Sequence, residues 1–272
     1  MRHKGFWLLL IACVLLAGCS RLTFVKPKME RKDGEQIAPE YRVSDSAATK
    51  KRMGNQERLI RASQRLRAGQ LDEAEREARQ LLKDDPQSVD AHTLLAVIED
   101  GRGRVEQSGQ HYKRAAELAP GNGAVQNNYG AWLCGNGFPA ESLVWFDRAL
   151  ADPDYPTPAA ALANAGGCAS RSGQHERAGR DLRRALELEP ANAFALAAMA
   201  QHEYRRQRYF EARAFIERRL AAAPANADVL KLASQIEEEL GDKAAASRYV
   251  QRLRAEFPGA VDAMNLGGNA VP

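Results

Sequence analysis

The sequence predicts an all-α protein in which short helices stack into an α-solenoid. Two observations predict this class. First, alanine-rich stretches fill the middle of the 272-residue chain and aromatic residues make up only 7% of it, a composition that favours helices. Second, prolines recur 34 residues apart in three pairs: Pro86 and Pro120, Pro190 and Pro224, and Pro224 and Pro258. A recurrence of this length predicts small units that stack on one another to bury a shared core.

The first 18 residues predict a signal peptide. A basic start at Arg2, His3 and Lys4 precedes an apolar run, residues 6–16, which has the length of a signal-peptide core. A membrane-spanning helix needs about 20 apolar residues, so this run is too short to span a bilayer.

The end of this run predicts a lipid anchor. The letters "LAGC", residues 16–19, resemble a bacterial lipobox, in which the cysteine is acylated and becomes the first residue after cleavage. The prediction is therefore that Cys19 is the lipidation site; the alternative is an ordinary signal peptide that contains a cysteine by chance. Ser20 follows Cys19, and by resemblance to known sorting signals this favours the periplasmic face of the outer membrane.

Residues 19–52 predict a flexible tether. They are polar, contain Pro27 and Pro39, and show no sustained helical pattern of apolar residues. The repeats are predicted over residues 53–258, and residues 259–272 form a C-terminal tail. After removal of Arg2 and Lys4 with the signal peptide, 37 basic and 35 acidic residues leave a net charge of +2, which gives no support for nucleic-acid binding.

The interior of each unit confirms the period and defines its type. When each unit is numbered so that its proline is position 32, positions 8 and 20 hold only small residues and position 15 is glycine in five of six units. Position 8 holds Ala62, Ala96, Gly130, Gly166, Ala200 and Ser234. Position 20 holds Ala74, Ser108, Ser142, Ala178, Ala212 and Ala246. Position 15 holds Gly69, Gly103, Gly137, Gly173, Gln207 and Gly241. A 34-residue helix–turn–helix unit with this pattern is a tetratricopeptide repeat, so six such repeats are predicted.

No catalytic chemistry is predicted from the sequence. The histidines His92, His111, His175 and His202 are spread over different repeats and are assigned to solvated helix faces, so no metal site is expected. No serine or cysteine has a plausible base and orienting acid nearby, and "GNG", residues 135–137, lacks the Lys-Ser/Thr of a phosphate loop. We therefore expect no enzyme activity, no cofactor and no small-molecule substrate.

Two cysteines remain after Cys13 and Cys19 are accounted for. Cys134 and Cys168 fall on the first helices of neighbouring repeats, which lie side by side in a solenoid. A disulfide between them is possible if both side chains point into the seam, and it would suit an oxidising compartment. The alternative is a pair of buried free thiols.

First helices also line the concave groove of such solenoids, where partners bind. The candidate groove residues are Leu59, Val97, Asn127, Asn128, Phe194, Gln201 and Tyr204. This mixed apolar and amide surface lacks the lysine and asparagine arrangement that clamps a terminal carboxylate, so an internal peptide segment is the expected ligand. Packing against the next helix is the alternative for each residue.

Four stretches resemble one family. They are "NNYGAWLCGNG" (127–137), "ALADPDYPTPAAALANAGGCA" (149–169), "RYFEARAFIERRL" (208–220) and "IEEELGDKAAASRYVQRLRAEFP" (236–258). Together with the lipobox they resemble the type IV pilus biogenesis and stability lipoproteins called PilF or PilW. The motif "DPDYPTPA", residues 152–159, is the most specific because it lies where 70 residues, rather than two periods, separate Pro120 from Pro190.

The resemblance implies a pilotin, an outer-membrane lipoprotein that helps the secretin subunit of the type IV pilus machinery to reach the outer membrane and multimerise. It thus implies the secretin and the outer membrane as partners, and a role in pilus biogenesis and twitching motility. The alternative is a periplasmic scaffold lipoprotein for cell-wall or outer-membrane assembly enzymes.

Overall fold

The computed structural model describes residues 45–260, and within them it is all-α, with helices α2 to α13 and no strand. The first four helices are α2 (Ala47–Arg67), α3 (Leu71–Asp84), α4 (Val89–Gly101) and α5 (Val105–Leu118). They are followed by α6 (Gly123–Gly135), α7 (Pro139–Leu150), α8 (Pro158–Arg171) and α9 (His175–Leu188). The last four are α10 (Ala193–Arg205), α11 (Tyr209–Ala222), α12 (Ala227–Glu239) and α13 (Lys243–Glu256).

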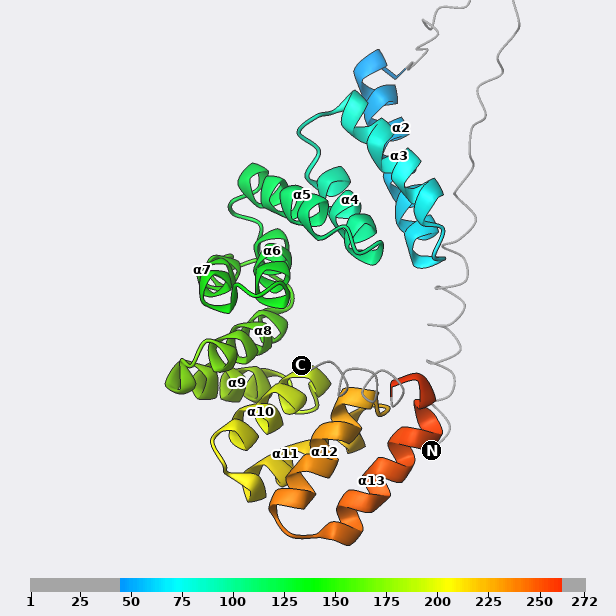
Figure 1. Cartoon of the computed structure of the whole chain (residues 1–272). Helices are drawn as coiled ribbons and strands as arrows, with labels where there is room; N and C mark the ends of the chain where they lie inside the picture. The colour runs from blue at the N-terminus through cyan, green and yellow to red at the C-terminus, as the bar shows by residue number, and fades with distance from the viewer. Residues whose placement is uncertain (1–44, 261–272) are drawn as a thin grey trace, which may run out of the picture. The chain divides into compact units, whose positions relative to one another are not determined.

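These helices form hairpins that follow one another in chain order, which confirms the predicted solenoid (Figure 1). Each hairpin pairs a first helix with the next one along the chain, starting with α2 and α3. In Figure 1, α4 and α6 lie on the inner side of the curved stack and α5 and α7 on its outer side. The first helices are thus the ones placed to line a groove.

Side-chain caps start four of the first helices. The side chains of Ser88, Asn122, Asn192 and Asn226 each accept a hydrogen bond from a backbone N–H in the first turn. Such a cap satisfies a donor that has no partner inside the helix. All four capping residues come two positions after a repeat proline: Pro86, Pro120, Pro190 or Pro224. The proline that follows one helix and the cap that begins the next therefore lie at a fixed spacing in the sequence.

Small residues at positions 8 and 20 allow the two helices of a hairpin to approach closely. At Gly130 a Cβ atom would lie 2.9 Å from the ring of Phe146, and at Gly166 it would lie 2.5 Å from the side chain of Leu182. Both larger side chains are fully buried. This geometry explains the small residues at these positions, because a longer side chain would force the helices apart.

Position 15 requires a left-handed backbone. Its five glycines have φ between +70° and +92°, which glycine adopts without steric cost. Gln207 occupies the sixth such position and has the same conformation, with φ of 60°. A non-glycine residue there costs about 1–2 kcal/mol, so the turn geometry of the repeat prevails over the local preference of Gln207.

The insertion that breaks the period has a structural role in this fold. Asp152 accepts a hydrogen bond from the backbone N–H of Gly123 at the start of α6, at 2.7 Å. The Tyr155 ring is buried against Gly123, where a Cβ would lie 2.8 Å from it. Pro158 then begins α8. The motif therefore packs the end of the third repeat against the start of α6, the first helix of the same repeat.

The predicted boundary between tether and repeats is wrong for residues 47–52. Helix α2 begins at Ala47 and includes this alanine- and lysine-rich stretch, whose residues have high helix propensity. The predicted signal peptide, Cys19, residues 20–44 of the tether and residues 261–272 of the tail lie outside the described residues. No helix in the described range is both long and apolar enough to cross a membrane.

Candidate partner-binding groove

The predicted groove residues lie on four first helices. Leu59 is on α2, Val97 on α4, Asn127 and Asn128 are on α6, and Phe194, Gln201 and Tyr204 are on α10. Phe194 is 56% exposed and Val97 is 37% exposed, so both are apolar side chains open to solvent. The other five are partly buried. The structure does not bring all seven into one pocket, because Leu59 and Asn128 line different ones.

Two of these residues belong partly to the core, as the packing alternative expected. Leu59 packs against Ala62, Leu94 and Leu95, between the first two repeats. Tyr204 packs against the cluster that includes Ile216 and Ile236, and its ring centroid lies 5.6 Å from that of Tyr209. Their partly exposed edges remain open to a partner, but truncating either residue would also disturb the stacking of repeats.

Asn127 is committed to the seam between repeats. Its Oδ1 accepts a hydrogen bond from Nδ2 of Asn164 on α8, at 3.0 Å. This bond joins the first helices of the third and fourth repeats directly. The Asn127 side chain therefore aligns α6 and α8, and Asn128, one position along, is the amide that faces a pocket.

The pocket at Asn128 has a volume of about 430 Å³ and is lined mainly by α6. Its lining residues are Asp100, Tyr112, Asn128, Ala131, Trp132, Gly135 and Asn136. Amide, phenol and carboxylate groups beside an indole ring can bind a polypeptide, through hydrogen bonds to its backbone and contact with an apolar side chain. Burial and the nearby Asp100 raise the pKa of Tyr112 to about 12, so its hydroxyl stays protonated and can donate.

Trp132 and Asn136 were not among the predicted groove residues. Trp132 is four residues after Asn128, so the two share one face of α6, and this spacing is the signal that could have identified it. In the sequence Asn136 belongs to the "GNG" segment, which was considered only as a phosphate loop. Its side chain donates to the backbone oxygen of Trp132 at 2.8 Å and lines the same pocket.

A second pocket of about 470 Å³ lies beside Leu59. Lys51 and Arg52 on the early part of α2 contribute one part of its lining, and Asp84, Asp85 and Asp90 contribute another. It exists because α2 begins at Ala47, before the predicted start of the repeats. Opposite charges on its walls suit a polar ligand with both signs of charge, such as an extended peptide.

The structure joins Cys134 and Cys168 by a disulfide, with Cα atoms 5.9 Å apart. This bond links α6 to α8 and lies in a cluster with Leu143, Phe146 and Ala178. It pins the same two first helices that the Asn127–Asn164 hydrogen bond aligns. The first helices of the third and fourth repeats are therefore joined by a covalent bond.

The assignment of the histidines to solvated faces is wrong for His202, which is fully buried. Histidines also meet in pairs: the Nδ1 atoms of His92 and His111 are 3.0 Å apart, and the rings of His175 and His202 are 5.8 Å apart. Burial lowers the pKa of His92, His111 and His202. Within the described residues no group of three potential ligands could hold a metal ion.

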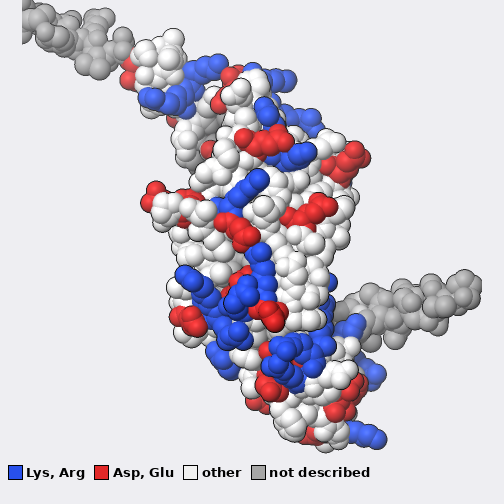
Figure 2. Space-filling model, turned by 90° about the vertical axis from the view of Figure 1, so that its left-hand side faces the viewer, with Lys and Arg blue, Asp and Glu red and all other residues white. Residues whose placement is uncertain are grey.

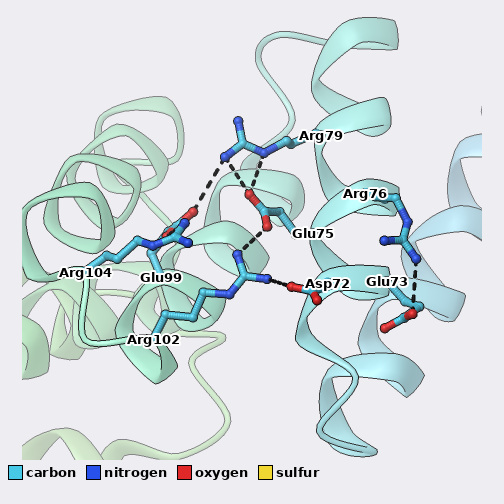
Figure 3. A network of polar contacts seen from close by, with 8 residues as sticks. All are labelled: Asp72, Glu73, Glu75, Arg76, Arg79, Glu99, Arg102 and Arg104. Atoms are coloured by element: carbon cyan, nitrogen blue, oxygen red, sulfur yellow. Dashed lines mark hydrogen bonds and ion pairs between the residues drawn. The ribbon is translucent and has the colours of Figure 1, made fainter.

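An ion-pair network holds the seam between the first two repeats (Figure 3). Glu99 on α4 is only 2% exposed and pairs with Arg104 at 3.0 Å and with Arg79 of α3 at 3.7 Å. Arg102 contacts Glu75 and Asp72 of α3. Its hydrogen bond to Glu75 lowers the pKa of Glu75. A buried carboxylate with two guanidinium partners avoids the cost of an unpaired charge.

Comparison with known proteins supports this architecture. Models of the tetratricopeptide repeat match residues 61–123 and 159–192. The solved structure of PilW, described as a widely conserved type IV pilus biogenesis factor, is 30% identical with a TM-score of 0.69; the match covers 75% of this chain and 94% of that one. A solved structure of PilF from Pseudomonas aeruginosa is 22% identical with a TM-score of 0.66, and covers 80% and 99% of the two chains.

A curated protein with a similar sequence is the type IV pilus assembly protein PilF of Pseudomonas aeruginosa. It is 26% identical over 152 residues, which are 56% of this chain and 60% of the relative. Stacked helical hairpins with these repeats define a tetratricopeptide-repeat protein, a class that presents extended binding surfaces. Because its similarity to PilW extends over nearly all of that structure, the chain belongs to the PilF/PilW family of type IV pilus biogenesis proteins.

Proposed function

We propose that this protein is a pilotin, anchored through Cys19 to the periplasmic face of the outer membrane. There it binds the secretin subunit of the type IV pilus machinery and promotes its localisation and multimerisation in the outer membrane. Pilus biogenesis and twitching motility depend on it in this proposal. The observation that carries the proposal is the 30% identity to PilW, a type IV pilus biogenesis factor, over 94% of that chain.

The protein acts by binding, without catalysis. An internal segment of the secretin lies along the first helices, with Asn128 and Trp132 at the pocket on α6 and the exposed side chains of Val97 and Phe194 as apolar contacts. The disulfide and the Asn127–Asn164 hydrogen bond support this role, because a rigid groove loses less entropy when a partner binds. No cofactor, nucleic acid or small-molecule substrate takes part.

The lipid contributes through location. A tether confines the groove near the membrane, so a secretin subunit that arrives there meets a raised effective concentration of its binding site without any new contact. Each buried acyl methylene stabilises the anchor by about 0.8 kcal/mol, and stable attachment takes more than one chain or signal. The groove and the anchor therefore both promote the same step, the binding of a secretin subunit at the membrane.

A matched pair of valines tests the groove. Val97 lies on the first helix α4 and is 37% exposed, whereas Val144 lies on the second helix α7 and is 48% exposed. Val97→Asp should reduce secretin multimers on an unboiled gel and lower co-purification of the secretin, while Val144→Asp should leave both unchanged. Equal effects of the two substitutions, with equal protein levels, would show that the inner face is not the binding site.

Cys19→Ala tests the anchor. It should move the protein out of the outer-membrane fraction and reduce the secretin there, while the groove still binds secretin in solution. Unchanged fractionation refutes the anchor. If deletion of the gene leaves secretin multimers at their normal level, the pilotin proposal fails and the alternative scaffold role for cell-wall or outer-membrane assembly enzymes is favoured.

A further inference from the structure

The arginines differ along the chain in whether they form ion pairs with carboxylates. No lysine lies between Lys113 and Lys231, so arginine supplies all the permanent positive charge in that range. Five exposed ones lie on α9 and at the end of α10, and we call them the arginine surface: Arg180, Arg183, Arg184, Arg205 and Arg206. In the part of the chain that the structure describes, none of these five forms an ion pair within salt-bridge distance.

The first two repeats provide the contrast. There Arg79, Arg102 and Arg104 are all paired with carboxylates across or beside the seam, as Figure 3 shows. Arg58 and Arg76 are paired as well. The first two repeats thus pair most of their arginines with carboxylates, whereas on α9 and at the end of α10 Arg177 is paired and the five arginines of the arginine surface are not.

Like charges crowd the arginine surface. Arg180 and Arg184 are four residues apart on α9, a spacing at which like charges repel. Arg205 adds to the effect of burial in lowering the pKa of Arg171. The arrangement destabilises the free protein slightly, and an anion bound nearby would remove that repulsion.

A buried histidine lies beside these cations. His202 is 0% exposed, and its Nε2 has no hydrogen-bond partner in the described part of the chain. That atom points toward α9: a Cβ on Gly179 would lie 3.7 Å from it and 3.3 Å from a guanidinium nitrogen of Arg183. Burial, followed by the charges of Arg206 and other cations, lowers the pKa of His202 to about 4.

Two exposed apolar side chains lie four residues after arginines of this surface, Leu188 after Arg184 and Phe210 after Arg206. Phe210 at the start of α11 is 74% exposed, and Leu188 at the end of α9, four residues after Arg184, is 52% exposed. Arginine and aromatic residues are enriched at protein interfaces, and arginine is among the residues that contribute most of the binding energy. In Figure 2 basic side chains gather over the lower part of the visible face, with acidic side chains between them.

We propose that the arginine surface, with Phe210 and Leu188 beside it, binds an acidic polypeptide segment of a protein partner. Each guanidinium offers a planar fork that binds a carboxylate through two parallel hydrogen bonds. The exposed Glu176 and Glu187 of α9 favour a polypeptide over an anionic membrane, because separate acidic side chains can avoid them whereas a uniformly negative surface cannot. The surface is centred on the second helix α9, so this inference does not rest on secretin binding in the groove.

Two variants of equal charge test the proposal. In the surface variant Arg180, Arg184 and Arg206 are replaced by Gln. In the control variant Arg67, Arg248 and Arg254, which are also exposed and form no ion pair among the described residues, are replaced by Gln. Binding of a fluorescein-labelled oligoglutamate to the full chain is measured by fluorescence anisotropy in a non-ionic detergent. Binding of a lipid probe, dihexanoyl phosphatidylglycerol, is tested separately.

We expect saturable binding of the oligoglutamate that the surface variant weakens about tenfold and the control variant leaves unchanged. Added salt should weaken the binding of the unmodified chain, since it screens exposed charges. The proposal is overturned if the oligoglutamate does not bind, if both variants lose the same affinity, or if only the phosphatidylglycerol binds at the arginines. Thermal unfolding of both variants verifies that each remains folded.

Discussion

The indole ring of Trp132 lies directly against Gly109, so closely that a Cβ at Gly109 would be 2.3 Å from two of its ring atoms. Gly109 is on α5 and Trp132 is on α6, so the contact joins the second and third repeats. Trp132 also lines the pocket that contains Asn128. Packing between repeats therefore positions a side chain of the candidate groove.

Gly109→Ala should destabilise the protein even though alanine favours a helix. Overpacking of this kind costs about 1–3 kcal/mol, which exceeds the roughly 0.5–1 kcal/mol that alanine gains over glycine inside a helix. Gly179→Ala is the matched control, because it occupies the equivalent position on α9 and its nearest neighbour is the flexible end of Arg183, at 3.3 Å. Urea unfolding should separate the two. Equal midpoints would contradict the contact with Trp132.

Loss of the disulfide should lower stability by about 3–4 kcal/mol in the chain-entropy model, since Cys134 and Cys168 are 34 residues apart in sequence. The variant Cys134→Ala/Cys168→Ala, unfolded in urea beside the oxidised chain, measures this loss. The oxidised chain in the presence of reductant is the control and should approach the variant. Mass spectrometry of unreduced protein in which both thiols accept an alkylating reagent would exclude the bond.

Arg102→Met should destabilise the seam between the first two repeats, because the carboxylate of Glu75 loses a guanidinium partner. The guanidinium lies between two carboxylates of α3 and its side chain is only 14% exposed, so its loss leaves Glu75 without that partner. Arg76→Met is the control in the same region. Arg76 is 69% exposed and pairs with Glu73 one turn away, and such surface pairs contribute about 0–1 kcal/mol. A double-mutant cycle of Arg102→Met with Glu75→Gln should show coupling, and additive losses would argue against the pairing.

Acidification should destabilise the protein through His202. Its pKa is lowered from 6.5 to about 4, so the unfolded chain binds a proton at a higher pH than the folded chain does. Between these values the unfolded state holds more protons, and stability therefore falls as the pH is lowered through this range. From pH 7 to pH 5.5 the expected loss is about 1 kcal/mol.

The comparison of the unmodified chain with His202→Gln isolates this effect. Gln does not titrate, so the variant should lose less stability than the unmodified chain over the same pH interval, whatever its stability at pH 7. The contributions of His92 and His111, whose pKa values are also lowered, are present in both proteins and cancel. Parallel pH profiles would show that His202 is not buried in its neutral form.

The groove was only partly accessible from the sequence. Repeat positions correctly placed Val97 and Phe194 on first helices, where they are exposed. They could not show that Asn127 is bonded to Asn164, or that Trp132 rather than Asn127 shares the pocket with Asn128. A position in the repeat specifies a helix face, whereas the contacts of that face depend on the side chains of the next repeat.

The sequence by itself determined the helical hairpins, their number and their turns. These features are local: glycine at a left-handed turn, small residues where two helices touch, and proline where a helix ends act within one repeat. The tertiary structure alone decided which polar groups are buried together. Glu99, Glu203 and Glu237 are buried at position 11 of three repeats, each beside an arginine, and His202 is buried without a partner for Nε2 in the described range. The pairs of Glu99 with Arg79 and of Glu237 with Arg213 join neighbouring repeats. They depend on the rotation between successive repeats, which sums many small packing contacts and cannot be read from any single repeat.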